Sequence, residues 1–236
     1  EIKRPKGPAE NLIIIGCACF GTALPVRSYF QLLEELDISY TVLRKEYCCG
    51  APLILGALQA GEDRKTYDDY SREFIGLNIA QAREAGCKRM VHLCVWCAYL
   101  SKRFFPDSDI EQVYAPDILM GPLRERKLRL PDTSIGYFPG GQHRSWLYAP
   151  DRDFEFSWPE YRELLDTVGG IRVVDIPKYC CVIAPDAIFS WAQKHQANRV
   201  VTPCLPCYGG LSRRAPEGMQ VDSIYDLLLE AVAAGG

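Results

Sequence analysis

A pair of adjacent cysteines occurs twice in this chain, and a Cys-x-x-Cys motif follows each pair. The pairs lie in KEYCCGAP (45–52) and PKYCCVIAP (177–185), and the later motifs lie in KRMVHLCVWC (88–97) and NRVVTPCLPC (198–207). A looser match joins IEQVYAPDIL (110–119) to GMQVDSIYDL (218–227). Self-similarity of this kind indicates an internal duplication. We therefore predict that two copies of one structural unit make up most of the chain.

Strand and helix patterns alternate in the same order in both halves. The first half has strand patterns at 11–15, 39–45 and 89–93 and helical patterns at 26–36 and 62–86. The second half has strand patterns at 133–138, 171–176 and 198–202 and helical patterns at 158–169 and 185–196. This alternation predicts an α/β fold of two duplicated Rossmann-like units with parallel or mostly parallel sheets. The paired cysteines follow predicted strands, so we expect them at the strand C-terminal ends, where sites form in such sheets.

The two copies differ in length. We place the first repeat at residues 1–123, a linker at 124–134 and a second, degenerate repeat at 135–236. The second repeat has a much shorter span between its cysteine pair and its Cys-x-x-Cys, so we expect it to lack much of the long helix predicted at 62–86. It gains the aromatic and charged segment 143–161, which is either a packed surface loop or a loop that docks a partner or covers a substrate.

Composition narrows the functions that such repeats can have. The net charge is −3, and the one basic run, RERKLR (124–129), is as easily a solvated linker, so no nucleic-acid partner is expected. No apolar run reaches the ~20 residues of a membrane helix and no signal-peptide pattern is seen, so we expect a cytoplasmic protein with no membrane span. Eleven cysteines exceed what core packing needs, and in a reducing compartment such clusters bind metal or carry out redox chemistry.

Residue chemistry alone leaves four interpretations of the cysteines open. They are buried singly for packing, or they form disulfides, which the compartment and the strained ring of an adjacent pair disfavour. A zinc ion suits Cys94-x-x-Cys97, whereas the side chains of adjacent Cys48 and Cys49 diverge and make a poor second pair for one small ion. An iron–sulfur cluster presents several irons, so adjacent thiolates can each bind a different iron.

The order of these motifs resembles the CCG cysteine-rich domain family, with Cys17, then Cys48-Cys49-Gly50, then Cys94-x-x-Cys97. That family includes the B-type subunit of heterodisulfide reductase, its heterodisulfide-reductase-like relatives in sulfur oxidation, and iron–sulfur subunits of glycolate oxidase and lactate utilisation. The resemblance implies that these five cysteines hold a noncubane 4Fe–4S cluster and are catalytic through it. It implies an oxidoreductase acting on a sulfur group, which reduces or forms a disulfide or sulfur-carrier bond.

The second repeat departs from the family pattern. Aligning IIIGCAC (13–19) with YFPGGQH (137–143) puts Gly141 where Cys17 stands and His143 where Cys19 stands, so His143 is a candidate neighbour of the second site. Val182 replaces the glycine of the CCG triplet. The remaining four cysteines would hold a second 4Fe–4S cluster, a zinc ion or no metal; they are Cys180, Cys181, Cys204 and Cys207. We therefore expect catalysis in the first repeat.

Electrons must pass to or from another protein, because the chain has neither a ferredoxin-type cysteine run nor a Gly-x-Gly-x-x-Gly fingerprint. The resemblance implies a ferredoxin-like iron–sulfur subunit and a flavoprotein subunit as partners, with a disulfide or thiol substrate that includes a protein-bound sulfur carrier. Two other functions stay open. One is a non-catalytic iron–sulfur electron-transfer subunit of a flavoprotein redox complex, and the other is a zinc-stabilised interaction module.

Two further side chains lie beside or within the first Cys-x-x-Cys. His92 precedes Cys94 by two positions on a predicted strand, so it is a candidate catalytic proton donor or sulfur hydrogen-bond donor, or else a satisfied core histidine. Trp96 either shields a cluster from water or simply packs. Other candidates have ordinary interpretations, namely packing for Cys19 and Cys87 and solvation for His195.

Overall fold

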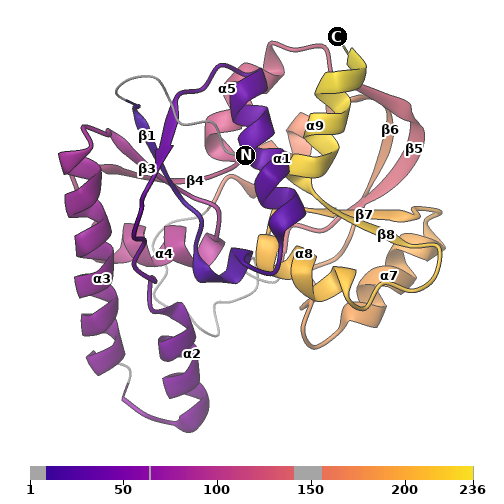
Figure 1. The fold of residues 1–236 in the computed structure, drawn as a ribbon. Helices are drawn as coiled ribbons and strands as arrows, with labels where there is room; N and C mark the ends of the chain where they lie inside the picture. The colour runs from indigo at the N-terminus through magenta and orange to yellow at the C-terminus, as the bar shows by residue number, and fades with distance from the viewer. Residues whose placement is uncertain (1–8, 64, 141–155, 236) are drawn as a thin grey trace. The chain divides into compact units, whose positions relative to one another are not determined.

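Two parallel four-stranded sheets form the framework of the structure (Figure 1). The computed structural model describes residues 9–63, 65–140 and 156–235. The first sheet has the order β2-β1-β3-β4, with β1 at Asn11–Ile14, β2 at Tyr40–Val42, β3 at Arg89–His92 and β4 at Glu111–Tyr114. The second has the order β6-β5-β7-β8, with β5 at Arg129–Tyr137, β6 at Gly169–Asp175, β7 at Arg199–Thr202 and β8 at Gln220–Ser223.

The two sheets have the same topology, because the first, second, third and fourth strands of each half occupy equivalent places. The predicted α/β class with duplicated parallel units is therefore confirmed. The central strands are short apolar runs, as expected for strands covered on both faces. Leu12 and Ile13 of β1 and Val91 of β3 are fully buried, and so are Val200 and Val201 of β7.

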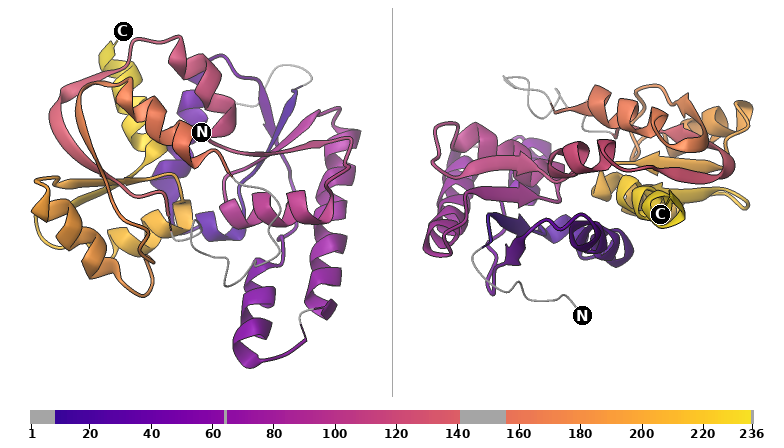
Figure 2. Two further views of the ribbon diagram at one scale, coloured as in Figure 1. Left: turned by 180° about the vertical axis from the view of Figure 1, so that it is seen from behind. Right: turned by 90° about the horizontal axis from the view of Figure 1, so that it is seen from above.

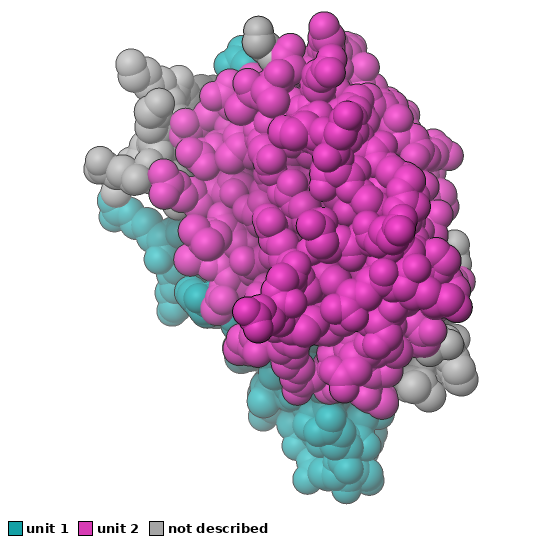
Figure 3. Space-filling view, turned by 90° about the vertical axis from the view of Figure 1, so that its right-hand side faces the viewer, with its two compact units in different colours: residues 1–20, 37–115 teal, residues 21–36, 116–236 magenta. Residues whose placement is uncertain are grey.

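The chain divides into two compact units (Figure 3). One unit is Glu1–Phe20 with Asp37–Ala115, and the other is Gly21–Leu36 with Pro116–Gly236. The first unit holds the first sheet with the 3-10 turn η1 (Cys17–Cys19) and three helices, α2 (Ala51–Ala60), α3 (Lys65–Glu84) and α4 (Val95–Phe104). The second unit holds the second sheet with α1 (Ala23–Glu35), α5 (Asp117–Arg124), α6 (Trp158–Asp166), α7 (Pro185–Lys194), α8 (Leu205–Ser212) and α9 (Ile224–Gly235).

Helix α1 connects β1 to β2 of the first sheet but packs against α9 in the second unit (Figures 1 and 3). The rings of Tyr29 and Tyr225 meet edge to face, with centroids 4.9 Å apart. Ser28 Oγ donates a hydrogen bond to Asp226 Oδ1 at 2.5 Å. Helices α5 and α6 make a second such pair, in which Tyr161 donates a hydrogen bond to Asp117. Strand β5 begins at Arg129, inside the segment that we expected as a linker.

The predicted long helix at 62–86 corresponds to α3 and forms a helical hairpin with α2 (Figures 1 and 2). The single helix α7 takes the place of this hairpin in the second repeat, which confirms the expected shortening there. The sequence patterns did not predict α2, which begins just after the first cysteine pair. They also did not predict α4 or α8, which begin inside the Cys-x-x-Cys motifs. Of the helices that the structure describes, none is long and apolar enough to span a membrane.

Candidate functional site

Five thiols of the first unit form one contiguous group. The Sγ atoms of Cys17 and Cys48 lie 3.6 Å apart, and those of Cys49 and Cys97 lie 3.3 Å apart. A thiol hydrogen bond also joins Cys48 to Cys49, and another joins Cys94 to Cys97. None of the chain's eleven cysteines forms a disulfide. The structure thus brings together all five cysteines that the sequence singled out in the first repeat.

Sheet topology explains why these thiols meet. Strand β1 lies between β2 and β3. The chain passes from β1 to β2 on one side and then crosses to β3 on the other side, so the strand order reverses at β1. The carboxyl ends of adjacent strands at such a switch point leave a crevice in which ligands bind. Cys17 follows β1, and Cys94 follows β3 as the N-cap of α4, with Cys97 in the first turn of that helix. The sequence expectation that the cysteines sit at strand C-terminal ends matches this arrangement.

The group has a buried side and an open side. Cys94 and Cys97 are each 3% exposed and Cys49 is 6% exposed, whereas Cys17 and Cys48 are exposed to solvent. The three buried sulfurs lie at the protein side of the group, and the two exposed sulfurs form its solvent side. A molecule that approaches from solvent therefore meets Cys17 and Cys48 first.

Hydrogen bonds between the thiols shift the pKa values of three of these cysteines. Hydrogen bonds from Cys48 and Cys97 lower the pKa of Cys49 well below its ordinary value, although burial acts in the opposite direction. The contact with Cys49 is also the main reason why the pKa of Cys48 and that of Cys97 are raised. Cys49, at the centre of the group, thus accepts hydrogen bonds from a thiol on either side.

A glycine at the end of the first strand lets the backbone approach the Cys-x-x-Cys in each repeat. Gly16 has φ +77°, and a Cβ there would lie 3.1 Å from Cys97 Sγ. Gly140 has φ +108°, and a Cβ there would lie 2.8 Å from Cys204 Cβ. These two glycines occupy the same column when IIIGCAC is aligned with YFPGGQH. This shared column could have indicated a common role for the two glycines, although the sequence analysis assigned them none.

Gly50 of the CCG triplet has a separate structural reason. It is the N-cap of α2 with φ +78°, and a Cβ there would overlap Ser71 Oγ of α3. In the second repeat, Val182 stands at the equivalent position and is 70% exposed. The segment between β6 and β7, all of which the structure describes, contains α7 and no counterpart of the α2–α3 hairpin. The glycine is needed where α3 lies against it, and it is lost where that helix is missing.

The second unit holds a smaller thiol group. The Sγ atoms of Cys181 and Cys207 lie 3.3 Å apart, and a Cβ at Gly140 would lie 3.5 Å from both Cys204 Sγ and Cys207 Sγ. Cys180 is partly exposed. The predictions for Gly141, for His143 and for most of segment 143–161 lie outside the described residues. In the described part of that segment, three aromatic residues are buried, namely Phe156, Trp158 and Tyr161.

His92 is a buried neutral imidazole at the end of β3. Gln112 donates its amide N–H to the carbonyl oxygen of Ile110 at 2.8 Å, so its Oε1 accepts from His92 Nε2–H at 2.9 Å. Burial is the main cause that lowers the pKa of His92 to about 4. Among the described residues, its buried Nδ1 has no hydrogen-bond partner. The proton of this ring therefore points toward Gln112, and Nδ1 offers a lone pair.

The other candidate residues differ in burial and in ring contacts. Cys19 and Cys87 are buried, at 2% and 4% exposure, as expected for packing. Trp96 is partly buried and its ring lies 5.7 Å from that of Tyr99, measured between centroids. The expectation that His195 is solvated is wrong, because its ring lies 4.7 Å from that of Trp191 and its Nε2 atom is buried.

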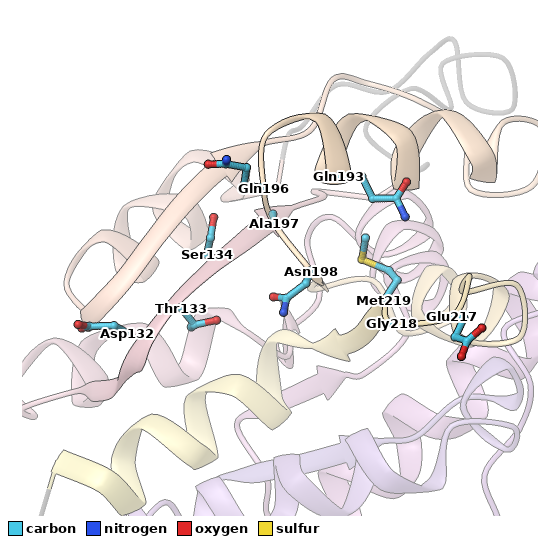
Figure 4. Close-up of a pocket in the computed structure, with 10 residues that line it drawn as sticks. All are labelled: Asp132, Thr133, Ser134, Gln193, Gln196, Ala197, Asn198, Glu217, Gly218 and Met219. Atoms are coloured by element: carbon cyan, nitrogen blue, oxygen red, sulfur yellow. The ribbon is translucent and has the colours of Figure 1, made fainter.

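A pocket of about 450 Å³ lies at the other end of the second sheet (Figure 4). Its lining comes from the first half of β5, the turn after α7 and the loop before β8, with Asp132, Gln196 and Glu217 among the polar side chains. No cysteine or histidine is among its described lining residues. The cysteines follow the carboxyl ends of the strands, whereas this pocket borders the amino ends, so it is not part of either thiol group.

The donor set of the first unit fits a cluster with several irons. Among the described residues, no group of three or more His, Cys, Asp and Glu side chains is arranged to hold a single metal ion. Five contiguous sulfurs, of which three are buried, are more than one tetrahedral ion binds, and they include an adjacent pair that can serve two irons. Soft, all-thiol donor sets of this kind bind Cu(I), zinc and iron–sulfur clusters.

Taken together, the fold and the site define a duplicated α/β protein with a cysteine-rich centre at the strand ends of its first unit. Residues 13–100 match the family model described as CCG, cysteine-rich domain. This part of the chain is therefore similar to the CCG cysteine-rich domain family, and its cysteines indicate an iron–sulfur or metal-binding role. The resemblance seen in the sequence is confirmed at the level of that family.

No curated protein matches the chain. Among solved structures, an aspartate racemase homologue from Pyrococcus horikoshii is 9% identical with a TM-score of 0.39, covering 95% of this chain and 98% of its own. A putative Asp/Glu racemase from Yersinia pestis is 11% identical with a TM-score of 0.45, at 95% and 98% coverage. A hypothetical protein from Helicobacter pylori is 13% identical with a TM-score of 0.49, covering 98% of this chain and 51% of its own. Similarities this distant carry no argument about function.

Proposed function

We propose that the chain is the iron–sulfur catalytic subunit of a heterodisulfide-reductase-like complex, and that it reduces or forms a disulfide or sulfur-carrier bond at the first unit. The observation that supports this most is the single group of five thiols with a buried side and an open side. A 4Fe–4S cluster of the noncubane type, when bound there, supplies one-electron redox chemistry next to a sulfur substrate. The coarser statement, a redox protein of the CCG type, agrees with the family match to residues 13–100.

The chain's own residues have distinct parts in this proposal. Cys49, Cys94 and Cys97 anchor the group from the protein side, where burial excludes water. Cys17 and Cys48 line the solvent side, so the sulfur substrate approaches next to them. His92 stays neutral, and its part is to accept a hydrogen bond at Nδ1 rather than to donate a proton. Partners that exchange electrons, namely a ferredoxin-like subunit and a flavoprotein, remain part of the proposal, as does a cytoplasmic location.

The second thiol group supports a secondary part. Cys181, Cys204 and Cys207 are buried, whereas Cys180 is partly exposed. Four thiols suffice for a second 4Fe–4S cluster or a zinc ion. We propose that this group relays electrons or stabilises the second unit rather than binding substrate.

Metal analysis of the anaerobically purified full chain tests this function. We expect about four irons and matching acid-labile sulfide for the first site alone, with an EPR signal after oxidation that depends on added thiol. The variant Cys49→Ala should lose this iron and the disulfide turnover. Cys87→Ala is the matched control, because Cys87 is equally buried but lies outside the thiol group, and it should keep both.

Other outcomes select the alternatives. Iron without a thiol-dependent EPR signal would favour a non-catalytic electron-transfer subunit. Zinc without iron would sink both redox functions and leave the interaction module. Disulfide turnover that survives Cys49→Ala would show that the first unit is not the reaction site.

A further inference from the structure

A carboxylate links the two loops that carry Cys17 and Cys48. Glu46 accepts hydrogen bonds from the backbone N–H of Ile15 at 2.8 Å and of Gly16 at 2.7 Å. These are the last residues before Cys17, and Glu46 itself precedes Cys48 by two positions. One side chain therefore fixes the loop after β1 against the loop after β2.

This contact requires a carboxylate or a close equivalent. Glu46 is half-buried, and each of its two carboxylate oxygens accepts one backbone N–H hydrogen bond. A glutamine at this position keeps the shape but has one oxygen, so it can satisfy only one of the two N–H groups well.

Asn78 of α3 holds the next residue in the same way. Its Oδ1 accepts from Tyr47 N–H at 3.0 Å, and its Nδ2 donates to the Tyr47 carbonyl oxygen at 2.7 Å. Asn78 is 3% exposed, and its helix is anchored by Ile75 and Ile79, which are each 2% exposed. The position of α3 is thereby passed through Tyr47 and Glu46 to the backbone before Cys17.

The second repeat lacks equivalents of both Glu46 and Asn78. Lys178 stands where Glu46 stands, and a lysine cannot accept a hydrogen bond. The described segment between β6 and β7 has no helix equivalent to α3, so nothing there corresponds to Asn78. This is also the repeat in which Gly141 replaces Cys17 in the sequence alignment. The cysteine and the side chains that would hold it are absent together.

We propose that Glu46 and Asn78 are positioning residues, which place Cys17 against Cys48 and so complete the five-thiol group. The spectroscopic part of this inference rests on the proposed iron–sulfur function. The geometric part does not, because it concerns the thiol of Cys17 in the metal-free chain. Neither residue is a ligand, and both act through Cys17.

Thiol labelling of the metal-free chain tests the geometric part. The full chain is stripped of metal under reducing, anaerobic conditions and alkylated with iodoacetamide, and modification of each cysteine is followed by mass spectrometry. We expect Glu46→Gln and Asn78→Ala to raise the alkylation rate of Cys17 several-fold while that of buried Cys87 stays unchanged. Glu73→Gln is the control, because Glu73 is an exposed carboxylate on α3.

Spectroscopy of the iron-loaded chain tests whether the effect runs through Cys17. We expect Glu46→Gln to retain most of its iron but to show the EPR and visible spectra of Cys17→Ser. In a Cys17→Ser background, Glu46→Gln should change the spectra no further. Glu46→Asp, which keeps both carboxylate oxygens, should recover part of the wild-type spectra.

Two results would overturn the inference. The first is a Cys17 alkylation rate that is unchanged in both variants, and the second is a spectral change by Glu46→Gln that adds to that of Cys17→Ser. If Glu46→Gln lowers the unfolding midpoint so far that the chain cannot be labelled when folded, Asn78→Ala alone carries the labelling test, because it leaves Glu46 unchanged. Failure to bind iron in the wild type would reject the proposed function and leave the labelling experiment intact.

Discussion

At the scale of single residues, the site is set as much by glycines and hydrogen-bond acceptors as by cysteines. The cysteines are visible in the sequence because their spacing is unusual, and the structure places all five of the first repeat together. Glu46, Asn78 and Gly16 carry no comparable spacing signal. Their parts depend on contacts between loops about 30 positions apart, which no local pattern encodes.

The glycine of the CCG triplet gives a matched pair of variants. Gly50 and Gly61 flank α2 with φ +78° and +70°, but a Cβ at Gly50 would overlap Ser71 Oγ whereas one at Gly61 would meet nothing. Both alanine variants incur the cost of a left-handed backbone, about 1–3 kcal/mol. We expect Gly50→Ala to lower the free energy of unfolding in urea by clearly more than Gly61→Ala. Equal losses would mean that α3 does not press on the cysteine loop.

The pair of His92 and Gln112 predicts a second stability effect. His92→Leu leaves the buried Oε1 of Gln112 without its donor, which should cost about 1–3 kcal/mol of unfolding free energy. Replacing both partners with leucine should recover part of this loss, because the Oε1 acceptor is then gone and only the Ile110 carbonyl oxygen loses a donor. Urea unfolding of the two single variants and the double variant measures the coupling, and strictly additive losses would contradict it.

At the scale of elements, the first three strands of each repeat and the long helix α3 were predictable, whereas β4, β8 and the helices at the cysteines were not. The apolar runs at 11–15 and 198–202 correspond to β1 and β7 within one or two residues. Helices α4 and α8 begin with VWCAYL and LPCYGG, which have no alternation of apolar and polar residues because they are largely buried. Their N-termini are recognisable only once the strand ends are known to deliver the cysteines there.

Helix α1 gives a prediction at this scale. Its buried residues include Tyr29, Leu32 and Leu33, and the helix packs on α9 with Tyr29 against Tyr225. A fragment of residues 1–123 lacks α9 and should therefore be protease-sensitive, although it contains the whole CCG match. In the full chain, Tyr29→Ala should cost about 3–5 kcal/mol of unfolding free energy. A fragment that is as protease-resistant as the full chain would contradict this account.

At the scale of the whole molecule, the duplication was predictable from repeated motifs. The difference in composition between the two thiol groups was predictable in part. The sequence shows that the second repeat lost a cysteine and a glycine. It does not show that the losses go with the missing α3, since that link needs the contact of Ser71 with Gly50 and of Asn78 with Tyr47.

The unequal groups predict unequal effects of serine variants. Cys97→Ser should abolish the thiol-dependent EPR signal, because Cys97 contacts Cys49 at the centre of the five-thiol group. Cys207→Ser, at the equivalent position of the second repeat, should leave that signal intact while lowering total metal. Total iron, zinc and EPR intensity per chain are measured side by side. Loss of the signal in Cys207→Ser alone would reverse our assignment of the two repeats.

The helix pairs have a consequence for how such a chain arose. The first helix of one repeat packs on the last helix of the other in both α1–α9 and α5–α6, with Tyr29 against Tyr225 and Tyr161 against Asp117. Tyr225 and Asp117 fall in the same column when the repeats are aligned. A one-copy ancestor would have left both helix faces bare unless a second copy of itself covered them, as in a symmetric homodimer. Gene fusion would then have made that pairing permanent, and freed one of the two thiol groups to lose a cysteine.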